Sequence, residues 1–413
     1  MKIATLSIGD ELVFGEIVDT NAAFIAQRLY DIGLKVKRHI TVGDVEADIV
    51  DAVEALAATS EAVIASGGLG PTIDDITARA AAKAVGRRLV LNEEALAHVR
   101  AFIGKMGRHV DPANEKQALF PAISALIPNP TGTACGFHFQ LNGCVFFFLP
   151  GVPGEMERMV DESVIPFLLA RRREERIIRV KVLKVFGQPE AELDSLLRGV
   201  TEQDSPVTVA FQVDFPQILV KLRAEGVNER DTASVLEETC RKTREILRGH
   251  IFAEDGETMD SAVAALFREK GLTLSLAESC SGGLVAKRIT DMPGSSAYFL
   301  EGAVTYSNAA KIRILGVSSQ LLEEKGAVSS EVALAMARGI RKLSGSDIGM
   351  AVTGIAGPAG GSEEKPAGTV FIALATHSGC HAKGYRFSGD RSKIRTIASF
   401  MALNWLRRYL LSQ

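Results

Sequence analysis

The residue with the clearest chemical potential in this 413-residue sequence is a serine at the point where an expected strand turns into a helix. Ser279 follows the apolar stretch 272–277 and stands in the sequence ESCSGG at 278–283, ahead of the expected helix. A serine at such a turn lies near the free N–H groups of the helix start, which can stabilise a developing oxyanion. Gly282 and Gly283 let a substrate carbonyl approach closely. The sequence therefore predicts a hydrolase nucleophile at Ser279.

A serine needs a base, because the hydroxyl alone is a weak nucleophile. No histidine lies nearby in the sequence, but the next expected strand leads through Tyr306 and Ser307 into a short helix that carries Lys311. A desolvated lysine can lose its proton and act as the base, and Tyr306 or Ser307 could orient it. Spacing alone leaves this pairing open, because most serines and lysines are structural or solvated.

Cys280 is an alternative nucleophile at the same turn. A helix terminus favours the thiolate form of a cysteine, although a lone cysteine is more often a small buried filler. If Ser279 is the nucleophile, Ser279→Ala abolishes hydrolysis and Cys280→Ala leaves substantial activity.

Two later stretches could form the walls of a pocket around the serine. Thr353 and Gly354 open a glycine-rich loop after an apolar strand. Arg391 and Arg395 lie one turn apart on an expected helix, where two guanidinium groups could hold a phosphate. The alternative for the arginines is a helix-surface pair answered by Asp390.

A second candidate site lies at the other end of the chain, in loops that follow apolar strands. These loops are GDEL at 9–12, GGLGPTIDD at 67–75 and PGVPGEM at 150–156. In an open α/β sheet, ligands bind beyond the carboxyl ends of the strands. Glycines let backbone N–H groups approach an anion, and Asp74 and Asp75 suit a hard divalent cation. The alternative is that Asp75 opens and caps the next helix while Asp74 is solvated.

The order of the expected strands and helices changes twice along the chain, which predicts three domains that position these residues. Residues 1–170 alternate strand and helix, which is typical of a doubly wound parallel α/β sheet, with a hairpin expected around Asn142-Gly143. Residues 177–254 have the order β-α-β-β-α-β of a small α+β module. Residues 258–413 alternate helix and strand again. The expected fold class is α/β.

Composition and charge exclude several classes of protein. The formal net charge of -3 gives no field that would attract nucleic acid. No apolar run reaches the ~18 residues needed to span a bilayer, and the first residues do not resemble a signal peptide. The five cysteines are scattered and never paired as C-x-x-C, which fits free thiols in a reducing cytoplasm.

Over its whole length the chain resembles the CinA family, the competence- and damage-inducible proteins of bacteria. The N-terminal part also resembles the molybdopterin-binding fold of molybdenum-cofactor biosynthesis proteins, and the middle module is similar to the family's KH-type domain. That module has no G-x-x-G loop, so it lacks the loop with which RNA-binding KH domains clamp the RNA backbone. We therefore expect it to serve as a structural or dimerisation module. Besides the loops given above, the resemblance rests on NEKQA at 114–118, VTYSNAAK at 304–311, GIAGP at 354–358 and FSGDR at 387–391.

The resemblance implies a bifunctional hydrolase of pyridine nucleotide recycling. The C-terminal domain would deamidate nicotinamide mononucleotide to nicotinic acid mononucleotide and ammonia, using Ser279, Lys311 and Tyr306 without a cofactor. The N-terminal domain would hydrolyse the pyrophosphate of ADP-ribose with Mg, Mn or Co held by Asp74 and Asp75. The expected substrate contacts are Glu278, Gly282, Gly283, Thr353, Gly354, Arg391 and Arg395 at the first site, and Glu11, Gly68, Pro71 and Thr72 at the second.

Two alternatives belong to other classes of function. The N-terminal domain could bind a pterin or nucleotide without cleaving it, or the chain could be an interaction protein of competence with vestigial sites. A homodimer is the expected default for a protein of this kind.

Overall fold

The computed structural model describes the chain except for residues 108, 110, 173–175 and 203. Two compact units form: Met1–Arg179 with Ala224–Ser234, and Val180–Arg223 with Val235–Gln413. Within the described residues, no helix is both long and apolar enough to cross a membrane.

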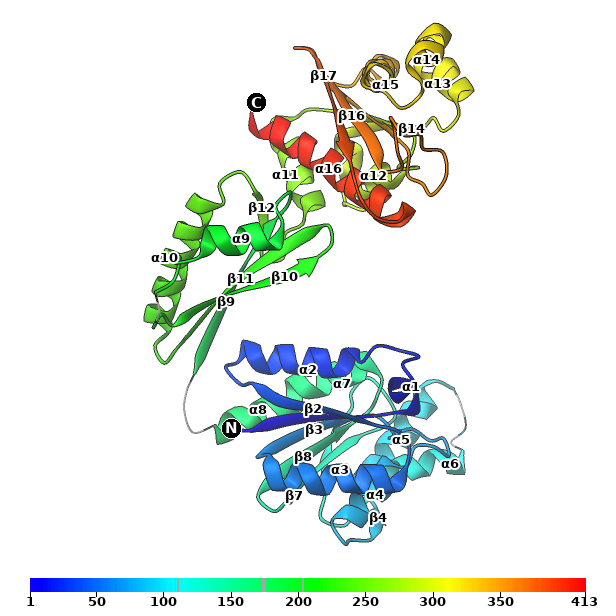
Figure 1. Cartoon of the computed structure of the whole chain (residues 1–413). Helices are drawn as coiled ribbons and strands as arrows, with labels where there is room; N and C mark the ends of the chain where they lie inside the picture. Colours follow the sequence, from blue (N-terminus) through cyan, green and yellow to red (C-terminus); the bar gives the residue numbers. More distant parts are fainter. Residues whose placement is uncertain (108, 110, 173–175, 203) are drawn as a thin grey trace. The chain divides into compact units, whose positions relative to one another are not determined.

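The N-terminal domain is built on a six-stranded sheet in the order β2-β1-β3-β8-β7-β6 (Figure 1). The strands β2, β1, β3 and β8 are parallel. The strand β7 pairs antiparallel with β8, and the edge strand β6 pairs antiparallel with β7. The strands are β1 (Ile3–Ile8), β2 (Val36–Val42), β3 (Ala62–Ser66), β6 (Ala125–Ile127), β7 (Gly136–Leu141) and β8 (Cys144–Leu149), with β4 (Leu89–Leu91) and β5 (Leu119–Pro121) pairing as a separate ribbon.

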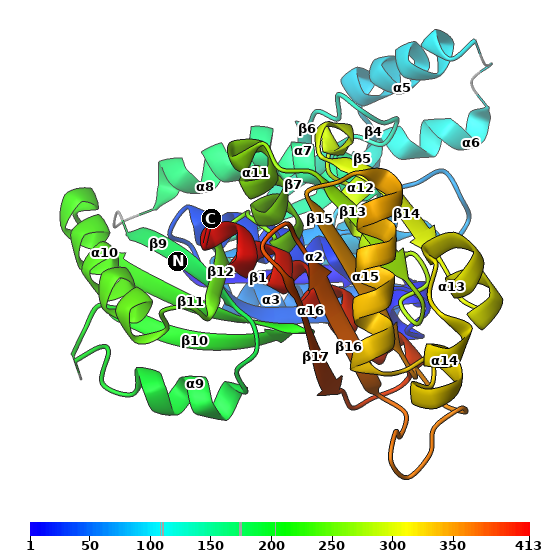
Figure 2. The same cartoon turned by 90° about the horizontal axis from the view of Figure 1, so that it is seen from above.

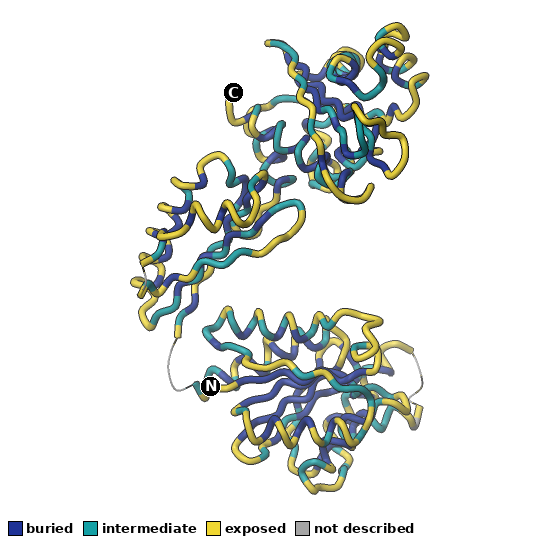
Figure 3. The backbone as a smooth tube through the Cα atoms, viewed as in Figure 1, coloured by how far each residue is buried: buried dark blue, intermediate teal, exposed yellow. Residues whose placement is uncertain are grey.

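Helices cover both faces of this sheet, and most of its central strands are therefore buried, as the dark blue colour in Figure 3 shows. Along β3, Ala62 and Ile64 face one core and Val63 and Ala65 face the other, because successive side chains of a strand point to opposite sides. The helices α2, α7 and α8 pack on the first face, and α3, α4 and α5 on the second. Their bounds are α1 (Asp10–Val13), α2 (Thr20–Asp31), α3 (Glu46–Thr59), α4 (Thr77–Ala84), α5 (Glu93–Lys105), α6 (Pro112–Glu115), α7 (Pro153–Met159) and α8 (Ile165–Arg171).

Two local expectations have different outcomes in this domain. The hairpin around Asn142-Gly143 is confirmed: it joins β7 to β8, and both residues have positive φ, 52° and 84°, as the turn of a tight hairpin requires. The expectation that Asp75 opens a helix is wrong, since α4 begins at Thr77 and its cap position, Ile76, offers no side-chain acceptor.

The middle module has the expected order β-α-β-β-α-β and a four-stranded sheet in the order β10-β11-β9-β12. Its elements are β9 (Ile177–Val185), α9 (Glu190–Leu197), β10 (Val207–Asp214), β11 (Gln217–Gly226), α10 (Glu229–Ile246) and β12 (Ile251–Glu254). Phe186 and Phe252 of this module pack on Phe400 of the C-terminal domain, with ring centroids 4.7 and 5.4 Å away. The two therefore share part of one apolar core.

The C-terminal domain contains a five-stranded sheet in the order β14-β13-β15-β16-β17. The strands β14, β13 and β15 are parallel, so their carboxyl ends lie at one edge. The strand β16 pairs antiparallel with β15, and β17 pairs antiparallel with β16. The helices α11, α12 and α16 cover one face and α13, α14 and α15 the other (Figure 2). The bounds are α11 (Met259–Lys270), β13 (Leu274–Glu278), α12 (Leu284–Thr290), β14 (Phe299–Val304), α13 (Asn308–Leu315), α14 (Ser319–Lys325), α15 (Ser330–Ser344), β15 (Ile348–Gly354), β16 (Thr369–Ala375), β17 (Cys380–Arg386) and α16 (Arg391–Leu411).

Candidate functional site

Ser279 lies at the carboxyl edge of the C-terminal sheet, directly after β13. Its backbone N–H donates to the carbonyl of Val352 on β15 at 2.9 Å. On the other side, the N–H of Thr305 donates to the carbonyl of Glu278 at 2.8 Å. The three parallel strands thus extend their pairing just far enough to fix the serine between the ends of its neighbours.

Lys311 reaches this serine from α13, as the sequence hypothesis requires. Its Nζ lies 3.2 Å from Ser279 Oγ, 2.8 Å from the carbonyl oxygen of Thr305 and 3.3 Å from that of Tyr306. The lysine is 1% exposed and forms no ion pair within the described part of the chain. Burial lowers the pKa of Lys311 below its ordinary value, because the charged form is poorly solvated there.

The three neighbours of Nζ can accept the three N–H groups of the charged lysine, and they can also serve its neutral form. A neutral amine has two N–H groups and one lone pair. The carbonyls of Thr305 and Tyr306 can only accept, so they take the two N–H groups. The Ser279 hydroxyl can donate, so it can point its proton at the lone pair. This geometry suits a base that withdraws a proton from the serine.

In the described contacts, neither Tyr306 nor Ser307 orients Lys311 through its side chain. Tyr306 contacts the amine through its backbone carbonyl, while its phenol accepts a hydrogen bond from Arg391 Nη2 at 2.9 Å. The Ser307 hydroxyl accepts from the N–H of Ala310 and caps α13. Both residues therefore position the helix that carries the lysine.

The rival nucleophile Cys280 is buried, with 5% of its surface exposed. Burial raises the pKa of its thiol to about 12, so at neutral pH the sulfur stays protonated and unreactive. The environment of the turn favours Ser279 over Cys280.

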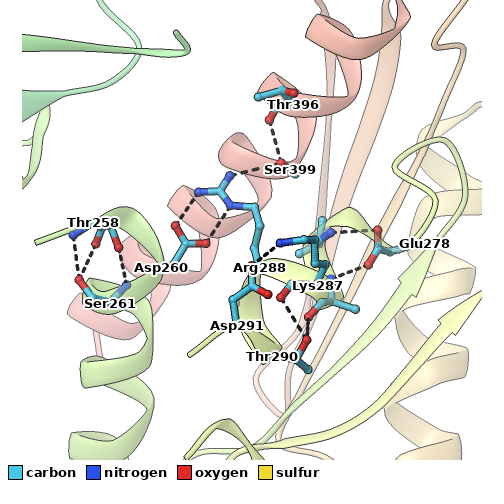
Figure 4. Close-up of polar contacts among 12 residues, drawn as sticks. Thr258, Asp260, Ser261, Glu278, Lys287, Arg288, Thr290, Asp291, Thr396 and Ser399 are labelled. Carbon is cyan, nitrogen blue, oxygen red and sulfur yellow. Dashed lines mark hydrogen bonds and ion pairs between the residues drawn. The ribbon is translucent and has the colours of Figure 1, made fainter. Parts of the chain in front are cut away.

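Glu278 was expected to contact substrate, but its carboxylate is occupied by the start of α12 (Figure 4). It accepts hydrogen bonds from the N–H groups of Gly283, Val285 and Ala286 at 3.0, 3.2 and 2.7 Å. The side chain is 2% exposed. A buried carboxylate at a helix N-terminus neutralises the dipole there, so Glu278 fixes the turn that holds Ser279.

Because of the hydrogen bonds at this turn, the N–H groups of Gly282 and Gly283 are already used and cannot face an oxyanion. The N–H of Gly282 donates to the Ser279 carbonyl at 3.1 Å, and that of Gly283 donates to Glu278. The backbone N–H groups of Cys280 and Ser281 have no oxygen acceptor within the described chain; the acceptor that both have there is the Cys280 sulfur. The two glycines instead serve the backbone, since both have positive φ, 62° and 90°.

Arg391 and Arg395 gather at this turn from the first turns of α16. Arg395 donates twice to the carbonyl of Ser281, at 3.2 and 2.8 Å. Arg391 donates to the carbonyl of Gly357 at 2.9 Å as well as to the Tyr306 phenol. Asp390 caps α16 by accepting from the N–H of Lys393, and it forms no ion pair with either arginine among the described contacts. Two guanidinium groups without an acidic partner can hold an anion beside the serine.

The structure gives Thr353 and Gly354, at the end of β15, mainly structural contacts. The Thr353 hydroxyl donates to the carbonyl of Ala327 at 2.8 Å. A Cβ at Gly354 would lie 2.7 Å from the carbonyl oxygen of Thr369 on β16, so glycine permits close strand pairing there.

The N-terminal candidate residues meet at a second site, a cavity of about 420 Å³ at the carboxyl edge of the N-terminal sheet. Its lining includes Glu11, Gly68, Pro71, Asp74 and Asp75; we call it the acidic cavity. Thr72 is the predicted residue that is not part of this lining. Its N–H and hydroxyl donate to Asp75 at 2.8 and 2.5 Å, which orients that carboxylate.

The acidic cavity contains a carboxylate that the sequence did not single out, Asp44, in the loop after β2. Asp44 and Asp10 each accept a hydrogen bond from the other's backbone N–H at 3.0 Å. Burial raises the pKa of Asp44, and repulsion from Asp10, Glu11 and Asp74 adds to the rise. Its position at the carboxyl end of a parallel strand was a signal that could have identified it.

A divalent cation would relieve this repulsion, and carboxylate oxygens are suitable donors for one. Within the described residues, however, no three His, Cys, Asp or Glu side chains are already gathered as a metal-ligand set. The assignment of a metal to Asp74 and Asp75 stays a prediction.

Comparisons with known proteins cover the whole chain. Residues 4–170 match a family described as "Probable molybdopterin binding domain", residues 180–253 the "Damage-inducible protein CinA KH domain", and residues 256–410 the "CinA C-terminal domain". A CinA-like protein of Geotalea uraniireducens (strain Rf4) is 63% identical over 412 residues, covering 100% of this chain and 98% of the relative. A CinA-like protein of Geobacter metallireducens is 58% identical over 412 residues, covering 100% of both. A crystal structure of a competence/damage-inducible protein from Agrobacterium tumefaciens is 41% identical and covers 37% of this chain and 93% of its own, with a TM-score of 0.36.

Proposed function

Since this chain belongs to the CinA family, we propose that its C-terminal domain is a serine amidohydrolase that deamidates nicotinamide mononucleotide. The observation that carries the proposal is the buried Lys311 amine beside Ser279, with two carbonyl acceptors and no acidic partner in the described chain. The choice of substrate rests on the family resemblance. The arginine pair beside the serine is consistent with a mononucleotide phosphate.

The reaction follows from the contacts of Ser279. Its oxygen attacks the carboxamide carbon while Lys311 Nζ takes the hydroxyl proton. The N–H groups of Cys280 and Ser281 stabilise the oxyanion of the tetrahedral intermediate. Lys311 then returns the proton to the leaving nitrogen, which departs as ammonia and leaves an acyl ester on Ser279. A water molecule, deprotonated by Lys311, attacks the ester. Lys311 returns this proton to Ser279 Oγ as the acyl bond breaks, which releases nicotinic acid mononucleotide and the free serine.

The test is ammonia release from nicotinamide mononucleotide by the native protein and two single variants. Ser279→Ala should abolish release. Cys280→Ala should retain most of it, because its backbone N–H remains and its thiol takes no part. Loss of activity in Cys280→Ala with retention in Ser279→Ala would transfer the nucleophile's role to the cysteine. No release by the native protein would favour the alternative of a competence-related interaction protein.

A second activity is proposed for the acidic cavity, the hydrolysis of the ADP-ribose pyrophosphate. The supporting observation is the set of carboxylates around Asp44, whose mutual repulsion a divalent cation would relieve. Asp74, Asp75 and Asp44 would hold this cation, which would neutralise pyrophosphate oxygens and activate water when bound. Backbone N–H groups of the glycine-rich loop at 67–70 would receive the phosphates.

The test of this second activity is turnover of ADP-ribose with added Mg²⁺, Mn²⁺ or Co²⁺. Turnover in the native protein and its loss in Asp74→Asn and Asp75→Asn are expected. Turnover that is indifferent to both variants would remove the metal assignment. Binding without turnover would support the alternative, a domain that only holds a pterin or nucleotide.

A further inference from the structure

A second, smaller cavity adjoins the acidic cavity in the N-terminal domain. Its volume is about 150 Å³, and Gly68, Leu69, Gly70, Asp75 and Gln117 line both cavities. The two spaces are therefore neighbouring compartments on either side of the glycine-rich loop. We call the smaller one the apolar cavity, because most of its remaining wall is apolar: Ile76, Ala78, Leu89, Leu119 and Phe120.

The size and lining of the apolar cavity suit a ring system. An apolar cavity of roughly this volume accommodates a benzene molecule in another protein. A phosphate or another charged group would lose its hydration among such side chains without compensation. The polar part of a ligand would therefore remain in the acidic cavity, where glycine N–H groups and carboxylates are available.

Gln117 places a polar side chain on the wall of the apolar cavity, where an apolar ligand would have no use for it. Its side chain is buried, at 5% exposure, and its Nε2 donates to Thr133 Oγ1 at 3.2 Å. Its Oε1 is buried and has no hydrogen-bond partner within the described residues. A buried amide oxygen without a partner is costly, and a ring N–H or exocyclic amine would satisfy it.

The other polar side chains on the wall of the apolar cavity already have partners. Asp75 accepts from Thr72, Arg79 is paired with Glu46 at 2.5 Å, and Lys116 donates to the carbonyl of Thr72. Among the described side chains of this wall, the buried atom without a partner thus belongs to Gln117. Because the Thr133 hydroxyl can donate or accept, the Gln117 amide can present either its oxygen or its NH₂ group to a ring edge.

We propose that the apolar cavity binds the fused nitrogen-containing ring of a ligand, a purine or a pterin, whose polar remainder lies in the acidic cavity. Gln117 reads the hydrogen-bonding edge of this ring, and Leu69 and Phe120 enclose its faces. The inference deepens the activity proposed for this domain by locating the ring, but it requires binding alone and no cleavage.

The test compares ligands that contain or lack the ring, using the full chain and calorimetric titration. The probes are AMP, neopterin and ribose 5-phosphate. The filling variant is Ala78→Met, which adds bulk to the apolar cavity. Its matched control is Ala84→Met, on the same helix α4 and also half-buried, but outside both cavities. Gln117→Leu removes the amide while keeping a similar side-chain volume.

The native protein should bind AMP or neopterin, and ADP-ribose should compete for the same site. Ala78→Met and Gln117→Leu should weaken that binding at least about tenfold, because the first fills the apolar cavity and the second removes the amide that pairs with the ring edge. Ala84→Met should leave it unchanged, and neither Ala78→Met nor Ala84→Met should alter ribose 5-phosphate binding. Whether AMP or neopterin binds more tightly identifies the source of the ring.

Failure of this inference is separable from failure of the pyrophosphatase proposal. Ring binding that is sensitive to Ala78→Met, in a protein that does not cleave ADP-ribose, supports the inference and removes the cleavage. The inference would be overturned if neither AMP nor neopterin bound to the native protein. It would also be overturned if Ala78→Met and Ala84→Met changed AMP binding equally, or if neither Ala78→Met nor Gln117→Leu changed it. These comparisons use variants whose thermal unfolding shows that they fold.

Discussion

At the scale of single residues, the burial of Lys311 decides what the C-terminal site can do. An exposed lysine holds its proton to about pH 10.4 and cannot act as a base at neutral pH. Lys311 is enclosed by Ser279 and two backbone carbonyls, and this desolvation lowers its pKa. The proton affinity of one side chain thus links the local packing to the proposed chemistry.

The lowered pKa of Lys311 predicts two effects of pH. The value of kcat/KM for deamidation should rise with pH as Lys311 loses its proton, with a midpoint below about 10.4. Between the folded and unfolded pKa values, the unfolded chain binds more protons, so stability should increase with pH in that window. Chemical denaturation of the native protein and Lys311→Met across this range measures the second effect. A stability difference between them that does not vary with pH would contradict a lowered pKa.

The raised pKa of Asp44 predicts a pH effect on stability opposite in sign to that of Lys311. This raised pKa means that the folded state binds more protons than the unfolded state as pH rises above about 3.9. Ionised Asp44 therefore costs stability at neutral pH, and Asp44→Asn should raise the melting temperature of the metal-free protein while weakening divalent-cation binding. Asp51→Asn, an exposed position on α3, is the control. A lower melting temperature for Asp44→Asn at pH 7 would be evidence against crowding of negative charge.

At the scale of elements, the start of α12 determines the geometry of the nucleophile. Glu278 binds three N–H groups at this helix start. Further along α12, Arg288 forms an ion pair with Asp260 of α11 at 2.8 Å and stacks on Phe400 of α16 (Figure 4). The helix is thus fixed both at its end and along its side, and the turn at Ser279 has little freedom to shift.

Glu278→Gln should therefore lower kcat more than it raises KM. The amide keeps the shape but loses the negative charge, and hydrogen bonds to a buried charged group contribute about 1.5–3 kcal/mol. A fall in kcat of at least about tenfold is expected, with a smaller free energy of unfolding. Asp291→Asn, at the exposed end of the same helix, is the matched control. If KM rises while kcat is unchanged, Glu278 contacts substrate, as the sequence first suggested.

The order of strands and helices and the hairpin at 142–143 could be predicted from the sequence, because turn residues and apolar stretches are local signals. The pairing of Ser279 with Lys311 was left open by their spacing and was expected only from the resemblance to the CinA family. The role of Glu278 could not be predicted, because a carboxylate beside a nucleophile reads equally as a substrate contact or as a helix cap. Gln117 was missed because its importance arises from burial beside residues distant in the sequence. Asp44 was missed although its place after an expected strand was a usable signal.

At the scale of the whole molecule, the two proposed sites belong to separate compact units. The acidic cavity lies within residues 1–155 and the Ser279 site within residues 278–395. The middle module shares an apolar core with the C-terminal domain through Phe186, Phe252 and Phe400. The residues proposed for each site all lie within one of the two units.

This separation predicts that the two activities can be removed one at a time. Ser279→Ala should abolish deamidation and leave ADP-ribose turnover unchanged. The double variant Asp74→Asn, Asp75→Asn should do the reverse. Both rates are measured on the same purified samples. Loss of both activities in either variant, with an unchanged melting temperature, would indicate that the sites are coupled.

The most direct test of the central claim is the rate of ammonia release from nicotinamide mononucleotide by Lys311→Met and Lys287→Met. The two variants remove the same group from two helices of the C-terminal domain, but Lys287 is exposed and paired with Asp291. Loss of a general base typically lowers the rate by about 10²–10⁴. The account predicts a fall of this size in Lys311→Met and a nearly native rate in Lys287→Met. A Lys311→Met protein that is folded and releases ammonia at the native rate would contradict it.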